Sequence, residues 1–165
     1  VKTEEHEEIN FDSNPKLKWL REFIDDLPKD EKVVIFFRFI KELRNLEAMF
    51  TDIKYVEVYG ETKDRQDKIN EFQKGEARLF FGQIQTAGLG VNLHSARYCI
   101  FLSNSYSHGD RLQAEERLHR IGQNRNVTYL DVIARNTIDE TILKCLKEKK
   151  DLAMQILEEI NEIKD

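Results

Sequence analysis

Two arginines, Arg117 and Arg120, have a side-chain type and a spacing that could act on phosphate groups. They lie three residues apart in the stretch QAEERLHRIGQNRN (113–126), and Gln113 precedes Arg117 by four residues. In a helix, these spacings bring all three side chains onto one face, about one turn apart. A guanidinium group is planar and permanently charged, so such a pair could hold phosphate oxygens through paired hydrogen bonds. A solvated helix face that pairs with the neighbouring glutamates is the simpler interpretation, and composition by itself favours it.

The elements that must position these arginines alternate along the chain between apolar runs and amphipathic stretches. The apolar, β-branched runs predict five strands, at residues 32–37, 55–59, 77–82, 98–102 and 127–134. Helical spacing predicts helices at residues 13–27, around 43–50, from a cap at Thr62 through Phe72, and at 111–121, with a short helix in 86–96. This alternation predicts an α/β fold in which a parallel sheet lies between two layers of helices.

A long helix from Thr137 onward closes the chain. Its apolar positions, including Ile142 and Ile156, recur at helical spacing, whereas its last residues, EEINEIKD, are too polar to bury. We expect this helix to pack on the sheet of the same lobe. The alternative is that it docks another lobe or another copy of the chain.

Composition and charge limit the classes of function. The chain has 165 residues with a net charge of −5, and this charge comes entirely from residues 1–31, which hold ten acids and five bases. Residues 77–109 contain no acidic residue, so this acid-free span could approach phosphate, although there is no domain-wide basic patch. No apolar run is long enough to cross a membrane. The two cysteines and four histidines lack metal-site spacing, and we expect an intracellular protein without a metal site.

Two loops follow predicted strands at the edge of the sheet where ligands gather. The turn YGETKDR (59–65) places Gly60 and Thr62 before a helix, where backbone N–H groups and a hydroxyl could hold a phosphate. Taken alone, the turn favours the simpler interpretation of an ordinary turn and helix cap. The loop GQIQTAGLGVNL (82–93) carries Gly88 and Gly90 but matches neither GxGxxG nor GxxxxGK[ST], and no phosphate loop of either kind occurs in the chain.

Taken in order, these pieces resemble the second RecA-like motor lobe of Swi/Snf-type ATPases of helicase superfamily 2. The segments that carry the resemblance are KVVIFFRF, YGETKDRQDKINEF, TAGLGVNL, QAEERLHRIGQ and TIDETIL, which together cover about residues 13–157. QAEERLHRIGQ is the most specific of them. The form looks more like the small bacterial, archaeal or viral members than the large chromatin remodellers. SNSYSHGD (103–110) stands where remodellers usually carry an Asp and a Trp-Asn-Pro.

The resemblance implies a RecA-like (P-loop NTPase-like) helicase C-terminal domain and assigns roles to residues. Arg120 would be the principal arginine finger on ATP and Arg117 its companion, with Gln113 orienting the site. The implied nucleotide-binding residues are Gly88, Gly90 and Asn92, and the implied contacts with the DNA backbone are Arg38, Gly60, Thr62 and Thr86. ATP and Mg²⁺ would be held mainly by a first RecA-like lobe, because this chain has neither its phosphate loop nor its acidic magnesium motif.

The chain is therefore expected to be half of a motor that translocates on double-stranded DNA. Residues 1–12 are expected to be an acidic, flexible segment, and residues 13–165 the lobe itself. The isolated lobe is expected to be a monomer without ATPase activity, located in the cytoplasm or the nucleoid, with no membrane contact. The alternative is a stand-alone, non-catalytic RecA-like module that binds nucleic acid or protein.

Overall fold

The structure is a computed structural model that describes residues 14–86, 91–119 and 123–162, with side chains described as far as Met154. It contains five strands, β1 (Val33–Phe37), β2 (Tyr55–Val58), β3 (Leu79–Gln83), β4 (Tyr98–Phe101) and β5 (Thr128–Asp131). They form one sheet in the order β2-β3-β1-β4-β5, and every neighbouring pair is parallel. The parallel sheet predicted from the apolar runs is confirmed.

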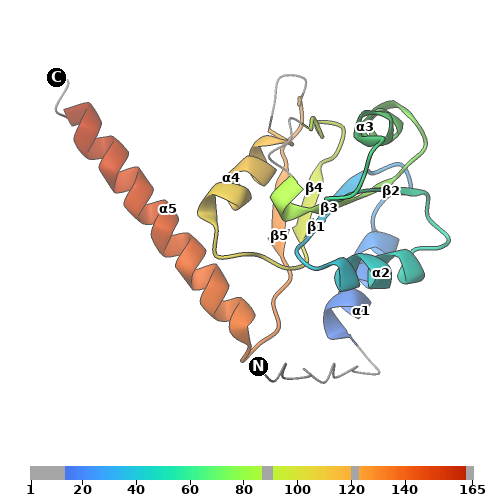
Figure 1. Ribbon diagram of the computed structural model, residues 1–165, viewed down its shortest axis with the longest axis horizontal. Helices are drawn as coiled ribbons and strands as arrows, with labels where there is room; N and C mark the ends of the chain where they lie inside the picture. Colours follow the sequence, from blue (N-terminus) through green and yellow to red (C-terminus); the bar gives the residue numbers. More distant parts are fainter. Residues whose placement is uncertain (1–13, 87–90, 120–122, 163–165) are drawn as a thin grey trace, which may run out of the picture.

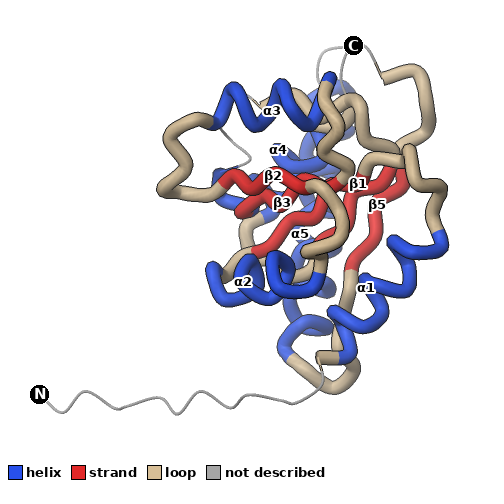
Figure 2. The backbone as a smooth tube through the Cα atoms, turned by 90° about the vertical axis from the view of Figure 1, so that its right-hand side faces the viewer, coloured by secondary structure: helices blue, strands red, loops and turns tan. Residues whose placement is uncertain are grey.

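Helices cover both faces of this sheet. On one face, α1 (Pro15–Asp26) and α2 (Ile40–Met49) bury leucines and isoleucines against β1, β3 and β4. On the other face, α3 (Arg65–Lys74) and α4 (His108–Glu116) pack through Ile69, Phe72 and Ala114. Figure 2 shows the sheet nearly edge-on between these two pairs of helices. The three-layer architecture is therefore as predicted.

The central strands form because their side chains are apolar on both faces. All five residues of β1 are buried, as expected for a strand with helices above and below it. Gly82 of β3 lies so close to β1 that a Cβ atom there would come within 2.9 Å of the Phe36 and Phe80 rings. A side chain at this position would have to displace these two rings from the face of the sheet.

Several element boundaries differ from prediction. The α3 helix begins at Arg65, so Thr62 does not cap it; the Thr62 hydroxyl instead accepts a hydrogen bond from the Tyr59 N–H. The predicted helix 111–121 begins earlier, where the Ser107 hydroxyl accepts a hydrogen bond from the Asp110 N–H, and it ends at Glu116. The β5 strand is shorter than predicted and only partly buried, because it lies at the edge of the sheet.

The long C-terminal helix, α5 (Ile138–Glu162), does not pack on the sheet, so that prediction is wrong. Its first turns contact α4, where Ile142 and Leu146 are buried, whereas Ile138 and Leu152 are exposed. Figure 1 shows α5 leaving the body of the molecule at an angle. The physical reason is that two helices already cover each face of the sheet. Within the described residues, no helix has the length and apolar character needed to cross a membrane.

Candidate functional site

The carboxyl ends of the strands carry a connected group of polar residues. The Gln83 side chain, at the end of β3, accepts a hydrogen bond from the Gly60 N–H (3.1 Å) and donates one to the Arg38 carbonyl (3.3 Å). Gly60 follows β2 and Arg38 follows β1, so one amide ties three strand ends together. Two of the predicted DNA contacts, Arg38 and Gly60, are thus brought to the same edge. The sequence did not single out Gln83, because its partners are distant along the chain.

The turn after β2 is held mostly by its own groups and by Arg65. The Thr62 N–H donates to the Tyr59 carbonyl (3.1 Å), and the Thr62 hydroxyl oxygen accepts from the Tyr59 N–H (3.0 Å). The Arg65 guanidinium donates to the Gly60 carbonyl (2.9 Å) from the first turn of α3. Since Thr62 uses its oxygen as an acceptor, its hydroxyl hydrogen stays available as a donor. The Gly60 N–H, by contrast, is already used by Gln83.

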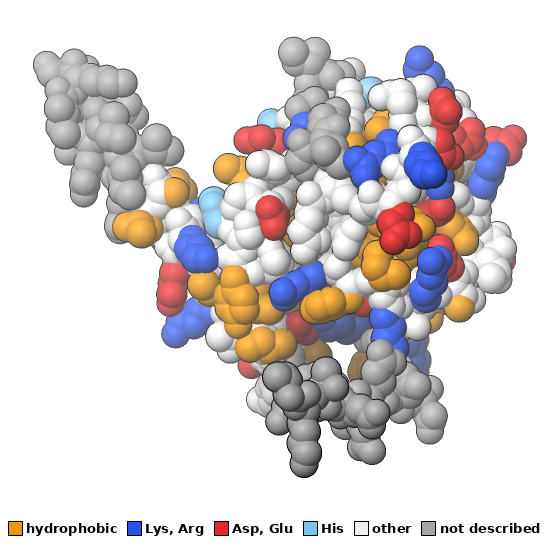
Figure 3. All heavy atoms as spheres, viewed as in Figure 1, with side chains coloured by type: hydrophobic (Ala, Val, Ile, Leu, Met, Phe, Trp, Pro, Cys, Tyr) orange, Lys and Arg blue, Asp and Glu red, His pale blue; other side chains and the backbone are white. Residues whose placement is uncertain are grey.

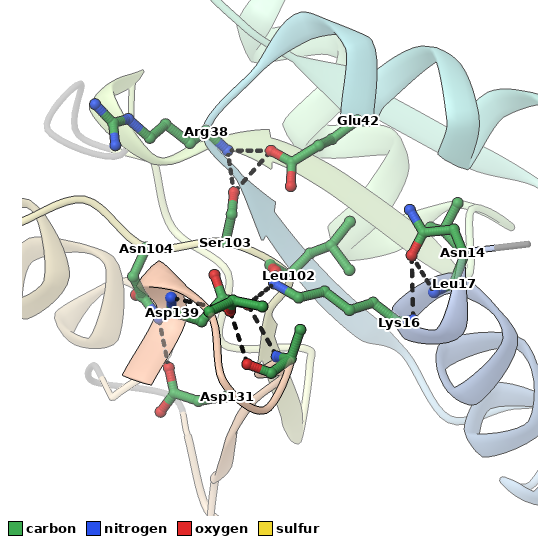
Figure 4. A network of polar contacts seen from close by, with 12 residues as sticks. Asn14, Lys16, Leu17, Arg38, Glu42, Leu102, Ser103, Asn104, Asp131 and Asp139 are labelled. Carbon is green, nitrogen blue, oxygen red and sulfur yellow. Dashed lines mark hydrogen bonds and ion pairs between the residues drawn. The ribbon is translucent and has the colours of Figure 1, made fainter. Parts of the chain in front are cut away.

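Arg38 presents its guanidinium at this edge. Its backbone N–H donates to both the Ser103 hydroxyl (2.9 Å) and the Glu42 carboxylate (3.1 Å), and Ser103 in turn donates to Glu42 (2.7 Å). Figure 4 shows the Arg38 side chain extending away from this network. Its guanidinium lies 4.9 Å from the centre of the Phe39 ring, and Phe39 is 56% exposed. The backbone is therefore fixed while a cation on an aromatic ring faces outward.

Thr86, the fourth predicted DNA contact, is buried. Its hydroxyl donates to the Gln83 carbonyl (2.7 Å), and it lies in the 3₁₀ turn Ile84–Thr86 that leads into the glycine loop. The Thr86 side chain therefore does not lie on the surface.

The end of α4 meets the segment that follows the glycine loop. The Leu93 N–H donates to the Arg117 carbonyl over 2.9 Å. Arg117 is the residue at the helix end, only 8% exposed, and shares the lining of a small internal cavity with Thr86 and Val91. Gln113 and Arg117 were predicted to share one helix face. Gln113 is exposed on α4, whereas Arg117 is buried, so the two side chains differ in accessibility. Arg120 lies outside the described residues, as do Gly88 and Gly90.

Asn92 lies between the glycine loop and this contact. Its side-chain oxygen accepts a hydrogen bond from the His94 N–H (3.2 Å), and its carbonyl accepts one from the Gln73 side chain on α3. Asn92 therefore follows the glycine loop directly in the chain, and its side-chain oxygen is used by the backbone N–H of His94, two residues further on.

A partly buried ionic group fastens α4 to the sheet. The Arg111 guanidinium lies 3.6 Å from the centre of the Phe101 ring and pairs with Asp131 and with Glu115 (2.6 Å). Asn104 accepts a further hydrogen bond from Arg111 (3.1 Å). Sequence reasoning missed this group because a charged pair twenty residues apart has no local signature. It anchors α4, the helix whose C-cap residue is Arg117.

The segment SNSYSHGD, which departs from the pattern of the large remodellers, supplies several of these contacts. Ser103 holds Glu42, Asn104 donates to Asp131 (2.7 Å), and Ser107 caps α4. The segment therefore joins the end of β4 to α2, β5 and α4.

The helicase conserved C-terminal domain family matches residues 15–122, which is more than half of the chain. The chain belongs to this family.

Longer proteins are similar to this chain over most of its length. The ATP-dependent helicase fft2 of Schizosaccharomyces pombe is 35% identical over 86% of the chain, and the chromatin-remodeling ATPase INO80 of Debaryomyces hansenii is 33% identical over 87%. The crystal structure of the C-terminal part of the Fun30 ATPase domain matches with a TM-score of 0.76 and 28% identity over 84% of the chain. The chain spans 11% of each of the two curated relatives and 47% of the solved chain.

These comparisons confirm the RecA-like helicase C-terminal fold. They give no support to the expectation of a small bacterial, archaeal or viral type, because the two curated relatives come from Schizosaccharomyces pombe and Debaryomyces hansenii. The relatives are ATP-dependent enzymes by name, whereas the roles assigned to single residues stay predictions.

The residues of this helicase C-terminal domain suit an anionic ligand better than a cation. The described residues from 77 to 109 include no acid, and Arg117 lines a small cavity with Thr86 and Val91, the described residues on either side of the glycine loop. Among the described residues, no group of three histidine, cysteine or acidic side chains could hold a metal ion. The nucleotide contact predicted here stays a prediction, and the described residues offer no cluster that would hold the predicted Mg²⁺.

Proposed function

We propose that this chain is the second motor lobe of a Swi/Snf-type, ATP-dependent translocase on double-stranded DNA. It supplies arginines to ATP bound by a first RecA-like lobe, on the same longer chain or on a separate one, and it grips the DNA backbone. ATP supplies the phosphoanhydride bond whose hydrolysis drives the motor, with Mg²⁺ held mainly by the first lobe.

The hydrogen bond from the Leu93 N–H to the Arg117 carbonyl is the observation that carries this proposal. It joins the stem of the glycine loop to the arginine segment, which are 24 residues apart in the numbering, at one place on the lobe. A site that contacts both the sugar side and the phosphates of a nucleotide needs these two segments together. Gly88, Gly90 and Asn92 would then line the nucleotide while the arginines reach its phosphates.

Arg120 and Arg117 have different roles in the proposed site. Arg120 acts as the finger that stabilises negative charge in the transition state, an effect of about 10³–10⁵ in rate where it is best measured. Arg117, which is buried, supports the glycine loop and completes the positive site from below. Gln113 is exposed on α4 and orients the site from the same helix.

The DNA contact lies at the carboxyl ends of β1 and β2. Arg38 and the Thr62 hydroxyl donate to phosphate oxygens, and Gly60 leaves the exposed turn without a side chain. Thr86 acts indirectly by holding Gln83. Such contacts are independent of base sequence, as a motor that moves along a duplex requires. The name of the INO80 relative supports chromatin as the place of action.

The test compares the isolated chain with a two-lobe protein in which a lobe bearing a phosphate loop precedes it. We expect DNA-stimulated ATP hydrolysis from the two-lobe protein and none above background from residues 1–165. Turnover by the isolated chain, free of contaminating ATPase, would contradict the half-site account. If neither protein hydrolysed ATP but the isolated chain bound duplex DNA, the stand-alone, non-catalytic binding module would be favoured instead.

A further inference from the structure

The α3 helix contacts the proposed DNA turn at one end and the proposed nucleotide segment near the other. At its first residue, the Arg65 guanidinium donates to the Gly60 carbonyl (2.9 Å). At its ninth residue, the Gln73 side chain is bonded to the segment 92–96, which begins with the proposed nucleotide contact Asn92. The rise along the helix from Arg65 to Gln73 is about 12 Å. One short helix therefore joins two proposed ligand contacts.

The helix is held firmly on the sheet between these two ends. Ile69 and Phe72 are buried in the core, and Lys68 pairs with Glu57 of β2. Figure 3 shows acidic and basic side chains mixed on the surface over α3, at the upper right of the view, so the outer face of the helix is an ordinary solvated surface. Because a packed interior is hardly compressible, a displacement at one end of this helix reaches the other end.

The half-buried Gln73 side chain uses both parts of its amide on the same segment. Its Nε2 donates to the Asn92 carbonyl, and its Oε1 accepts a hydrogen bond from the Ser95 N–H (3.2 Å). A carboxamide offers a donor and an acceptor side by side, so glutamine suits this place. Glutamate would set a carboxylate oxygen against the Asn92 carbonyl.

The arginine segment is bonded to residues 92–96 as well. In addition to the bond that the Arg117 carbonyl accepts from this segment, the Gln123 Nε2 donates to the carbonyls of His94 (2.9 Å) and Ala96 (2.9 Å). A continuous series of contacts therefore leads from the turn after β2, through α3 and residues 92–96, to the arginine segment.

We propose that Gln73 is a positioning residue that couples the DNA contact to the nucleotide site. DNA bound at the turn of Gly60 and Thr62 acts on α3 through Arg65, and Gln73 passes this effect to Asn92. Gln73 acts through residues 92–96 and not on DNA or nucleotide itself. The inference rests on the proposed function, since it concerns how DNA raises the rate of ATP hydrolysis. A lobe without this amide keeps both contacts but loses the free-energy coupling between them.

The first test compares Gln73→Ala and Gln73→Glu with the wild type in the two-lobe protein. Gln73→Glu keeps the size of the side chain and its acceptor but removes the donor. In both variants, we expect basal ATP hydrolysis and duplex binding near those of the wild type, and stimulation by DNA lowered at least about fivefold. Gln66→Ala is the matched control, because Gln66 is exposed on the same helix and donates to the neighbouring Asn70 (3.2 Å). Unchanged stimulation, or an equal loss of basal and stimulated turnover, would overturn the proposal.

Amide hydrogen exchange in purified residues 1–165 tests the same link without ATP hydrolysis. Adding duplex DNA should slow exchange in residues 92–96 of the wild type and of Gln66→Ala, and should leave it unchanged in Gln73→Ala and Gln73→Glu. A two-lobe wild type that hydrolyses no ATP would refute the proposed function, and exchange would then still decide the role of Gln73. An effect of DNA on residues 92–96 that is absent from the wild type, or that persists in Gln73→Glu, would overturn the proposal.

Discussion

The Leu93 N–H donates a hydrogen bond of 2.9 Å to the carbonyl of Arg117, and this bond fixes the glycine-loop segment to the end of α4. Arg117 itself is buried next to Thr86 and Val91, which flank that loop on both sides. The loop stem and the arginine segment therefore form one unit. A movement of one would be transmitted to the other, which is what a motor needs if nucleotide binding is to shift its DNA contacts.

The first prediction concerns Gln83, whose side chain joins the carboxyl ends of β1, β2 and β3. In a two-lobe protein, Gln83→Ala should reduce stimulation of ATP hydrolysis by DNA, because the Gly60 turn and Arg38 lose their common anchor. The two lost hydrogen bonds should lower the free energy of unfolding by about 1–2 kcal/mol. Gln85→Ala, at an exposed position in the same turn, is the control and should change neither quantity. Equal effects of the two substitutions would contradict this role for Gln83.

The features of the fold and the site that could be predicted from the sequence are those whose cause lies in neighbouring residues of the chain. The buried strands were predicted because VVIFF and ARLFF are continuous apolar runs, which only a sheet covered on both faces accommodates. The α5 helix was predicted, but its packing was not, since an apolar stripe does not say which surface it meets. The proposed site was predicted through short motifs. Gln83 and Arg111 were missed, because Gln83 joins strand ends and Arg111 pairs with Asp131, and only the folded sheet brings these groups together.

Arg38 and Thr62 should matter for DNA and little for the nucleotide. We expect Arg38→Ala and Thr62→Ala in the two-lobe protein to weaken DNA stimulation more than basal ATP binding. Duplex binding should be weak, independent of base sequence, and lost progressively with added salt as counterions compete. Filter binding at several salt concentrations measures this, with Arg44→Ala on α2 as a control for loss of an exposed arginine. Tight, salt-insensitive or sequence-specific binding would argue against a backbone grip.

Arg111 should be among the most important residues for stability. Arg111→Gln removes a guanidinium that is 12% exposed and leaves the Asp131 carboxylate without its main partner. We expect a loss of about 2–4 kcal/mol, somewhat less than for a fully buried pair because Asp131 is partly exposed. Chemical denaturation measures it, and Arg44→Gln, which removes an exposed pair with Glu47, should leave the midpoint nearly unchanged. Similar midpoints for both variants would show that the Arg111 group does not anchor α4.

The two cysteines should differ sharply in reactivity. Burial raises the pKa of the Cys99 thiol well above its ordinary value, so this thiol stays protonated and shielded in the folded protein. Cys145, on α5, is partly exposed. A thiol-specific reagent should therefore label one cysteine quickly and the second only after denaturation, and Cys145→Ser should abolish the fast phase. Fast labelling that persists in Cys145→Ser would mean that the β4 region opens readily.

The central claim is that the stretch 113–126, which carries Arg117 and Arg120, completes an ATPase site. Steady-state hydrolysis by a two-lobe protein tests this claim most directly. Arg120→Ala should abolish DNA-stimulated turnover with little loss of ATP binding, because a finger acts mainly in the transition state. Arg117→Ala should also be severe, and it should lower the melting temperature because this side chain is buried. Arg125→Ala, which removes an exposed arginine near the end of the same stretch, should leave turnover near normal. Near-normal turnover in both Arg120→Ala and Arg117→Ala would contradict the account, and the arginines would then belong to a solvated helix end.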